Sequence, residues 1–111
     1  MDFRTSRRIG EQRLDQAFTG LIRDDQGRAT VEVGRAGSGP EAAVKLWVDS
    51  AFTHLMVFSG DTVAPVRRRR GLAVEPMTCP PDMLRSGEGR VVLAAGERFE
   101  AAWGLEPAGL A

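Results

Sequence analysis

The stretch VKLWVDSAFTHLMVFSGD, residues 44–61, decides the fold class of this 111-residue chain. From Val44 to Val48 every second residue is apolar, which is the two-residue period of a strand with one buried face. His54 to Phe58 (HLMVF) is apolar on both faces and predicts a central strand covered on both sides. Ser59-Gly60-Asp61 is a typical strand end. The stretch therefore predicts two strands and no long amphipathic helix.

Upstream of this stretch, turn residues separate two further apolar segments. Asp24-Asp25-Gln26-Gly27 lies between the apolar segment from Ala17 to Ile22 and the alternating segment from Ala29 to Val33. This arrangement predicts a β-hairpin. Arg35 to Glu41 (RAGSGPE) is rich in Gly, Ser and Pro and predicts an exposed loop.

Downstream, the segment from Thr62 to Arg70 is too charged and proline-broken to be core. Gly71 to Glu75 (GLAVE) predicts a short strand that stops where Pro76 removes a ladder donor. Pro80-Pro81-Asp82 predicts a turn that opens into one helical turn around Met83 and Leu84.

The last third of the chain predicts two more strands and a frayed end. Arg90 to Trp103 divides at Ala95-Gly96-Glu97, and Phe99, Ala101 and Trp103 are expected to face inward on the second strand. The tail from Glu106 to Ala111 is expected to fray. With about seven short strands, we expect an all-β fold, an antiparallel β-sandwich or the C-terminal part of one.

Composition bounds the organisation and the class of partner. The length allows one domain, residues 1–111, and 42% hydrophobic with 27% charged residues is ordinary for a globular protein. Fifteen basic residues balance fifteen acidic ones, so no global field favours nucleic acid. No apolar run is long enough for a membrane span, and the lone Cys79 makes no intramolecular disulfide or thiolate metal site. We expect a soluble cytoplasmic chain with no nucleic-acid or membrane partner, no metal and no cofactor.

Glu75 is the most unusual residue in its local context. It closes the apolar run Leu72-Ala73-Val74 and is followed at once by Pro76. Partial burial at such a strand end would disfavour the charged carboxylate and suit a general base or acid. The alternative from the residues alone is a Glu at an exposed strand end.

Several segments, taken in chain order, resemble the aldose 1-epimerase (galactose mutarotase) family. They are DFRT (2–5), IG (9–10), LDQAFT (14–19), LWVD (46–49), LMVFSGD (55–61), LAVEPMTCPPD (72–82), SG (86–87) and AGE (95–97). Together they cover essentially the whole chain and correspond to the C-terminal portion of a family member.

The resemblance implies a β-sandwich that interconverts the α and β anomers of free aldohexoses without a cofactor. In that family a glutamate takes the proton from the C1 hydroxyl while a histidine protonates the ring oxygen. Glu75 stands at the position of the catalytic glutamate, and Asp15 at that of an aspartate that hydrogen-bonds sugar hydroxyls. Both roles suit carboxylates.

The resemblance also implies an incomplete site. The family's catalytic histidine lies in an N-terminal part that this chain lacks, and His54, the single histidine, does not match it, so we expect His54 to be structural or at the surface. We expect a truncated form that is weak or inactive unless another chain supplies the acid. Exposed strand edges are expected to pair with a second copy or such a complementing chain.

The competing interpretation is a non-catalytic β-sandwich module that binds carbohydrate or another protein. Nucleic-acid binding through the basic run Arg67 to Arg70 is a third interpretation, less favoured because the run lacks interleaved aromatics. Cys79 is expected to be an inert turn residue, since no histidine lies in its motif. Trp47 and Trp103 are expected to pack in the sandwich rather than stack on a sugar.

Overall fold

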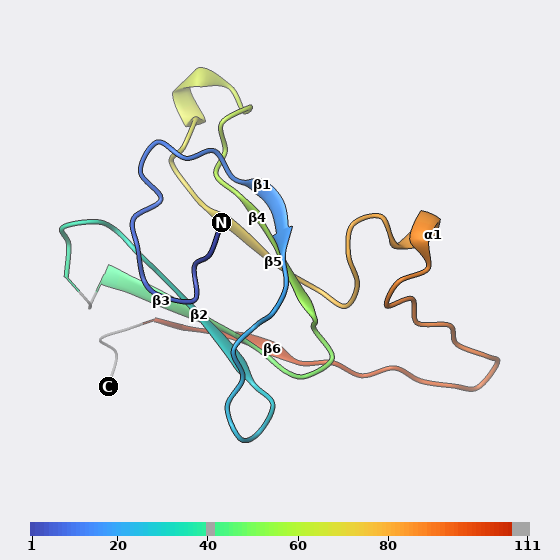
Figure 1. Cartoon of the computed structure of the whole chain (residues 1–111). Helices are drawn as coiled ribbons and strands as arrows, with labels where there is room; N and C mark the ends of the chain where they lie inside the picture. The colour runs from blue at the N-terminus through green and yellow to red at the C-terminus, as the bar shows by residue number, and fades with distance from the viewer. Residues whose placement is uncertain (40–41, 108–111) are drawn as a thin grey trace. The chain divides into compact units, whose positions relative to one another are not determined.

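Six β-strands form two three-stranded antiparallel sheets in the computed structural model, which describes residues 1–39 and 42–107 (Figure 1). One sheet belongs to a unit made of residues 1–21 and 52–92, and the other belongs to a unit made of residues 22–51 and the chain from residue 93 onward. The predicted all-β antiparallel class is confirmed, and two such sheets are consistent with a β-sandwich. That residues 1–111 form a single domain stays a prediction.

The first unit contains the sheet β1-β4-β5, with β1 at Asp15–Phe18, β4 at His54–Phe58 and β5 at Ala73–Met77. The prediction that residues 54–58 form a central strand is confirmed, because β4 pairs with β1 on one side and β5 on the other. The expected cover on both faces is not observed, since Leu55 is the only buried residue of β4. The core of this first unit contains Leu14 and Leu55, whose exposed fractions are 2% and 3%.

The predicted end of the strand at Pro76 is wrong. β5 runs through Pro76 to Met77, and Pro76 lies opposite Leu55 of β4. β5 is an edge strand, so one of its sides has no neighbouring strand in the sheet. A proline nitrogen on that side leaves no ladder hydrogen bond unmade. Glu75 is therefore an interior residue of β5 and not its last.

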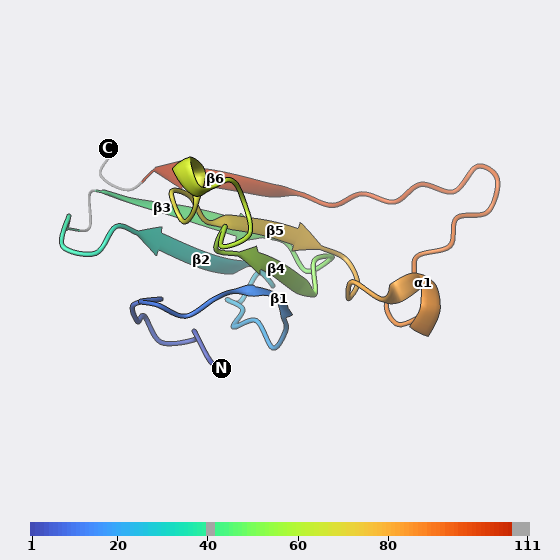
Figure 2. The ribbon, with the colours of Figure 1, turned by 90° about the horizontal axis from the view of Figure 1, so that it is seen from above.

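The second unit contains the sheet β2-β3-β6, with β2 at Ala29–Gly34, β3 at Ala43–Val48 and β6 at Trp103–Pro107 (Figure 2). The predicted alternation in residues 44–48 is confirmed at Leu46 and Val48, which are buried while Trp47 between them is less so, but Val44 is 42% exposed. The pairing of β2 with β3 runs over the full length of both strands.

The hairpin predicted for residues 17–33 is wrong in its pairing. The turn itself forms, with the Asp24 amide donating to the Arg28 carbonyl at 2.9 Å and a single bridge between Arg23 and Ala29. Beyond that bridge the strands part, because β1 belongs to the sheet with β4 and β2 to the sheet with β3. Long-range pairing prevails over the short connection.

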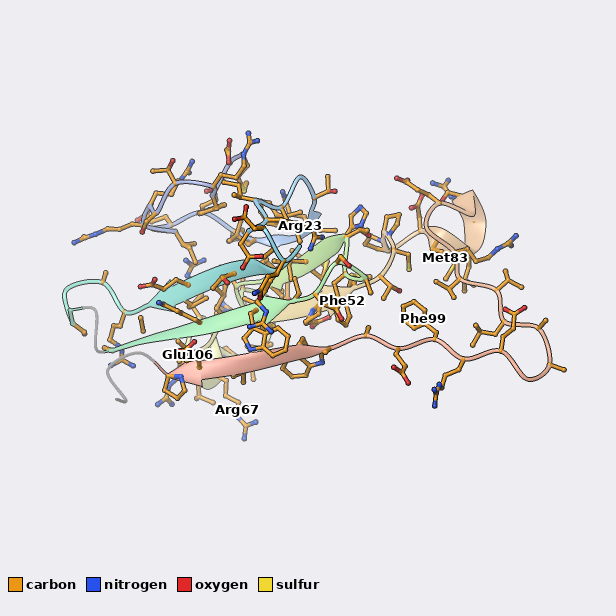
Figure 3. All side chains as sticks on the ribbon, turned by 90° about the horizontal axis from the view of Figure 1, so that it is seen from below. Arg23, Phe52, Arg67, Met83, Phe99 and Glu106 are labelled. Carbon is orange, nitrogen blue, oxygen red and sulfur yellow. The ribbon has the colours of Figure 1, made fainter. Side chains whose placement is uncertain are left out.

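The two strands predicted for residues 90–103 are also wrong. Every residue from Val91 to Ala102 is exposed and none is in a strand, although the predicted turn forms, with the Glu97 amide on the Ala94 carbonyl at 3.0 Å. Phe99, labelled in Figure 3, is 43% exposed and Trp103 is 52% exposed, so the expected inward faces are absent. No strand of the described residues pairs with this segment.

The C-terminal strand β6 starts at Trp103 and includes Glu106 and Pro107, which were expected to fray. Asp49 anchors the residue before β6. Its Oδ2 accepts the Ala102 amide at 2.7 Å, and the Asp49 amide donates to the Ala102 carbonyl at 3.0 Å. These two bonds align β6 with β3. The rest of the expected tail, residues 108–111, lies outside the described residues.

The remaining loops follow the predictions. Residues 35–39 are exposed, and residues 40 and 41 of the same predicted loop lie outside the described chain. Thr62 to Arg70 is exposed and contains the short 3-10 helix η2 at Pro65–Arg67. The single helical turn expected after Pro80-Pro81-Asp82 is α1 at Met83–Ser86, which Gly87 ends in the left-handed conformation at φ 75°.

Candidate functional site

Asp15 and Glu75 lie on the same sheet, on strands that flank β4. Asp15 of β1 pairs with Phe58 of β4, which in turn pairs with Ala73 of β5. Glu75 is two residues further along β5 and pairs with Met56. Cross-strand partners share a face, and so do residues two apart on one strand. The two predicted site residues therefore project from one face of the sheet β1-β4-β5.

We call this surface the carboxylate face. It consists of Asp15, Ala17, His54, Met56, Phe58, Ala73, Glu75 and Met77. Because neighbouring strands lie about 4.8 Å apart and each residue rises about 3.4 Å, the Cα atoms of Asp15 and Glu75 are separated by roughly 12 Å. The thioether of Met56 and the ring of Phe58 come from the strand between them, so two acceptor groups flank an apolar floor.

The opposite face of the sheet has a different character. Leu55 of β4 and Leu14, which precedes β1, are buried there, and the Phe18 ring contacts Phe3 edge-on at 5.7 Å between ring centroids. The Arg7 guanidinium lies 4.7 Å from the centroid of the Phe3 ring. The N-terminal segment thus packs on the apolar face, and the carboxylates lie on the other.

Glu75 is exposed, as the alternative interpretation from the residues alone predicted, and the partial burial that would suit a general base or acid is not observed. β5 continues past Pro76 and places Glu75 on an open edge. Asp15 is exposed as well. Both carboxylates are accessible to a polar ligand from solvent.

His54 is a residue of this face that the sequence reasoning set aside. It is the first residue of β4, it pairs with Met77, and it is half-buried. Its Nδ1 lies 2.8 Å from the Thr53 hydroxyl oxygen. The alternation of His54, Met56 and Phe58 gives them a common face, but only the register with β5 places Glu75 beside them.

The position of β1 depends on a polar network at the end of β4. The buried Ser59 accepts the Leu14 amide on Oγ at 2.8 Å, and the Ser59 amide donates to the Leu14 carbonyl at 2.8 Å. The Ser59 hydroxyl also contacts the Asp61 carboxylate. This network fixes the residue immediately before Asp15.

Arg69 extends the network to the N-terminal segment. Its Nη1 donates to Asp61 Oδ1 at 2.8 Å and to the Gln12 carbonyl at 3.1 Å, and its Nη2 donates to the Gly10 carbonyl at 2.5 Å. The hydrogen bonds from Ser59 and Arg69 lower the pKa of the Asp61 carboxyl below its ordinary value. One member of the basic run is therefore structural.

An open hollow of about 380 Å³ lies next to the carboxylate face. Phe58 and Ala73, the cross-strand partners in the Asp15 row, form part of its wall. Loop residues complete it: Gly60, Val63, Arg67, Gly71 and Leu72. The hollow is mostly apolar, and neither Asp15 nor Glu75 is among its lining residues.

The tryptophans lie in the other unit. The Arg28 guanidinium stacks over Trp47 at 3.8 Å from the ring centroid, and Trp47 pairs with Gly104 of β6. Trp47 is therefore engaged in packing, as expected, whereas Trp103 is half-exposed.

The described residues contain neither a metal-binding cluster nor a membrane-spanning helix. No group of three His, Cys, Asp or Glu side chains there is arranged to hold a metal ion. Over the same residues, no helix has the length and apolarity that crossing a bilayer requires.

Comparison with known proteins gives one match of modest identity. No family model matches the chain, and no solved structure matches it significantly. Among curated proteins it is similar to the uncharacterized protein YihR of Escherichia coli (strain K12), with 28% identity over 97 residues. The aligned region covers 87% of this chain and 28% of YihR, so the chain spans well under half the length of this relative.

Proposed function

We propose that the carboxylate face binds a free aldohexose and that the chain carries the proton-accepting half of a sugar mutarotase site. One observation supports this above the others: Asp15 and Glu75, singled out by the resemblance to aldose 1-epimerases, project from one face two strands apart. Sugar recognition needs several hydroxyl acceptors around an apolar floor, and this face provides both.

In the proposed reaction Glu75 takes the proton of the C1 hydroxyl as the bond from C1 to the ring oxygen breaks. The ring oxygen receives a proton from an acid, the free aldehyde rotates about the bond from C1 to C2, and the reverse steps give the other anomer. Asp15 holds the sugar by accepting hydrogen bonds from hydroxyls away from C1. No cofactor enters this scheme.

The acid is the missing part of the scheme. The family uses a histidine that no position of this chain matches, and general acid catalysis contributes about 10²–10⁴-fold to a rate. We therefore expect weak catalysis by the chain alone and stronger catalysis when a complementing chain provides the acid.

The test is the rate of anomer interconversion of fresh α-D-glucose and α-D-galactose, followed by polarimetry or NMR. The chain, its Glu75→Gln variant and a Glu88→Gln control are compared, because Glu88 is an exposed loop carboxylate outside β1, β4 and β5. A rate above the solvent background that only Glu75→Gln abolishes supports the proposal.

A second candidate, a non-catalytic sugar-binding module, is favoured by the exposure of both carboxylates and by the unmatched acid. It predicts sugar binding that Asp15→Asn weakens, with no rate above background even when a complementing chain is added. Absence of both rate and binding in a folded sample would contradict both candidates.

A further inference from the structure

His54 is held by its neighbour in a defined orientation. The Thr53 hydroxyl oxygen lies 3.2 Å from the Thr78 carbonyl and 2.8 Å from His54 Nδ1. The Thr53 backbone is itself fixed, because its amide donates to the Met77 carbonyl at 3.1 Å. The imidazole is thus tied to β5 through Thr53.

These contacts allow two positions for the ring proton. The Thr53 hydroxyl has one proton, and the Thr78 carbonyl oxygen can only accept it. When that hydrogen bond forms, the Thr53 oxygen is the acceptor toward His54, the proton is on Nδ1, and Nε2 of the neutral ring has a free lone pair. When the hydroxyl donates to Nδ1 instead, the proton is on Nε2. None of the hydrogen bonds among the described residues involves Nε2.

His54 belongs to the face that the proposed function uses. His54 is directly opposite Met77 of β5, and Glu75 is two residues from Met77. His54 and Glu75 are therefore diagonal neighbours, whose Cβ atoms lie about 7 Å apart in such sheets. The half-buried imidazole and the exposed carboxylate flank Met56, which pairs with Glu75.

We propose that His54 is a third sugar-contacting residue, whose Nε2 accepts a hydrogen bond from a hydroxyl of the bound aldohexose, and that Thr53 is the positioning residue that selects this tautomer. The inference rests on the proposed function for its ligand. It adds a neutral acceptor at the end of the face remote from Asp15, so the three groups fix the sugar at three points.

The first test observes the imidazole directly. Since His54 is the single histidine, a long-range ¹H–¹⁵N spectrum of the labelled chain contains one ring. At a pH where the ring is neutral, we expect the Nδ1–H tautomer in the free protein and a shift of Nε2, larger than that of Nδ1, on titration with D-galactose. A predominant Nε2–H tautomer would overturn the inference without any sugar present.

The second test uses variants that place an amide at one ring nitrogen or the other. The amide of Asn reaches the position of Nδ1 and that of Gln the position of Nε2. We expect His54→Asn to weaken galactose binding about three- to tenfold, the effect of one lost neutral hydrogen bond, and His54→Gln to stay within about twofold of the wild type.

Thr53→Val removes the hydroxyl at nearly constant volume and is matched by Thr62→Val, an exposed loop threonine. We expect mixed tautomers and weakened binding only in Thr53→Val. If Met56 signals respond to galactose while Nε2 does not, the inference is wrong and the proposed sugar site stands. If no signal of the carboxylate face responds, both fail.

Discussion

Gly104 of β6 lies directly opposite Trp47 of β3, and the indole occupies the space where a side chain at position 104 would begin. A Cβ built on Gly104 would be 2.5 Å from Trp47 Nε1. The Arg28 guanidinium stacks on the same ring, so Trp47 packs against both this guanidinium and the backbone of Gly104. An aromatic ring that covers a glycine across a sheet is a recognised way to stabilise an edge.

Gly104→Ala is therefore expected to destabilise the second unit by about 1–3 kcal/mol through overpacking. Urea denaturation followed by Trp fluorescence measures the change. Gly34→Ala is the matched control, because a Cβ on Gly34 of β2 would meet Ala43 Cβ at an ordinary 3.6 Å. Equal stability of the two variants would contradict the packing of Trp47 on Gly104.

Asp49→Ala is expected to loosen the start of β6. The substitution removes the carboxylate oxygens that accept the Ala102 amide at 2.7 Å and the Ala51 amide at 3.0 Å. It should lower the free energy of unfolding by about 1–3 kcal/mol. Hydrogen exchange of the Ala102 amide should accelerate more than that of β2 amides. Unchanged protection at Ala102 would show that Asp49 does not hold the strand.

The Asp61 network makes the first unit sensitive to acid. The pKa of Asp61 is lowered in the folded chain from its ordinary 3.8, so the unfolded chain binds more protons as pH falls. The stability that the charged Asp61 carboxylate contributes is present above pH 3.8 and is lost as the pH falls through the pKa of Asp61 in the folded chain. In Asp61→Asn, the midpoint of unfolding should decrease less steeply than in the wild type as the pH drops below about 4.

The control for that experiment is Asp25→Asn, which changes an exposed turn carboxylate. Some acid dependence remains in every variant, because Arg4 also holds the pKa of Asp2 well below its usual range. An Asp61→Asn profile that superimposes on the wild-type profile would contradict a stabilising role for the network.

Asp15→Asn is expected to weaken binding of D-galactose by about 1.5–3 kcal/mol, the range for a hydrogen bond to a charged group. Isothermal titration calorimetry or NMR titration gives the affinity. Gln16→Ala is the control on the same strand, since Gln16 projects from the opposite face. Equal losses in both variants would indicate an effect on β1 and not on the sugar.

Local pattern was sufficient to predict the central strand β4 and the half-buried strand β3, because both have strong alternation or apolar character of their own. It failed where pairing depends on distant residues. The segment before Trp103 alternates well but has no partner strand, whereas residues 103–107 form β6 because β3 and Asp49 receive them.

The candidate site shows the same division. The resemblance identified Asp15 and Glu75 individually, but periodicity cannot show that strands about 60 residues apart in the chain align them on one face, since register is a long-range property. His54 was expected to be structural or at the surface because it does not match the family's catalytic histidine. Its place on the carboxylate face follows only from its pairing with Met77.

Methyl NMR during a galactose titration shows whether the carboxylate face is the sugar site. We expect saturable shifts for Met56, Ala17 and Ala73 on that face, with Val57 and Val74 on the opposite face unmoved. Shifts confined to the opposite face, or no shifts in a folded sample at high sugar concentration, would contradict this expectation.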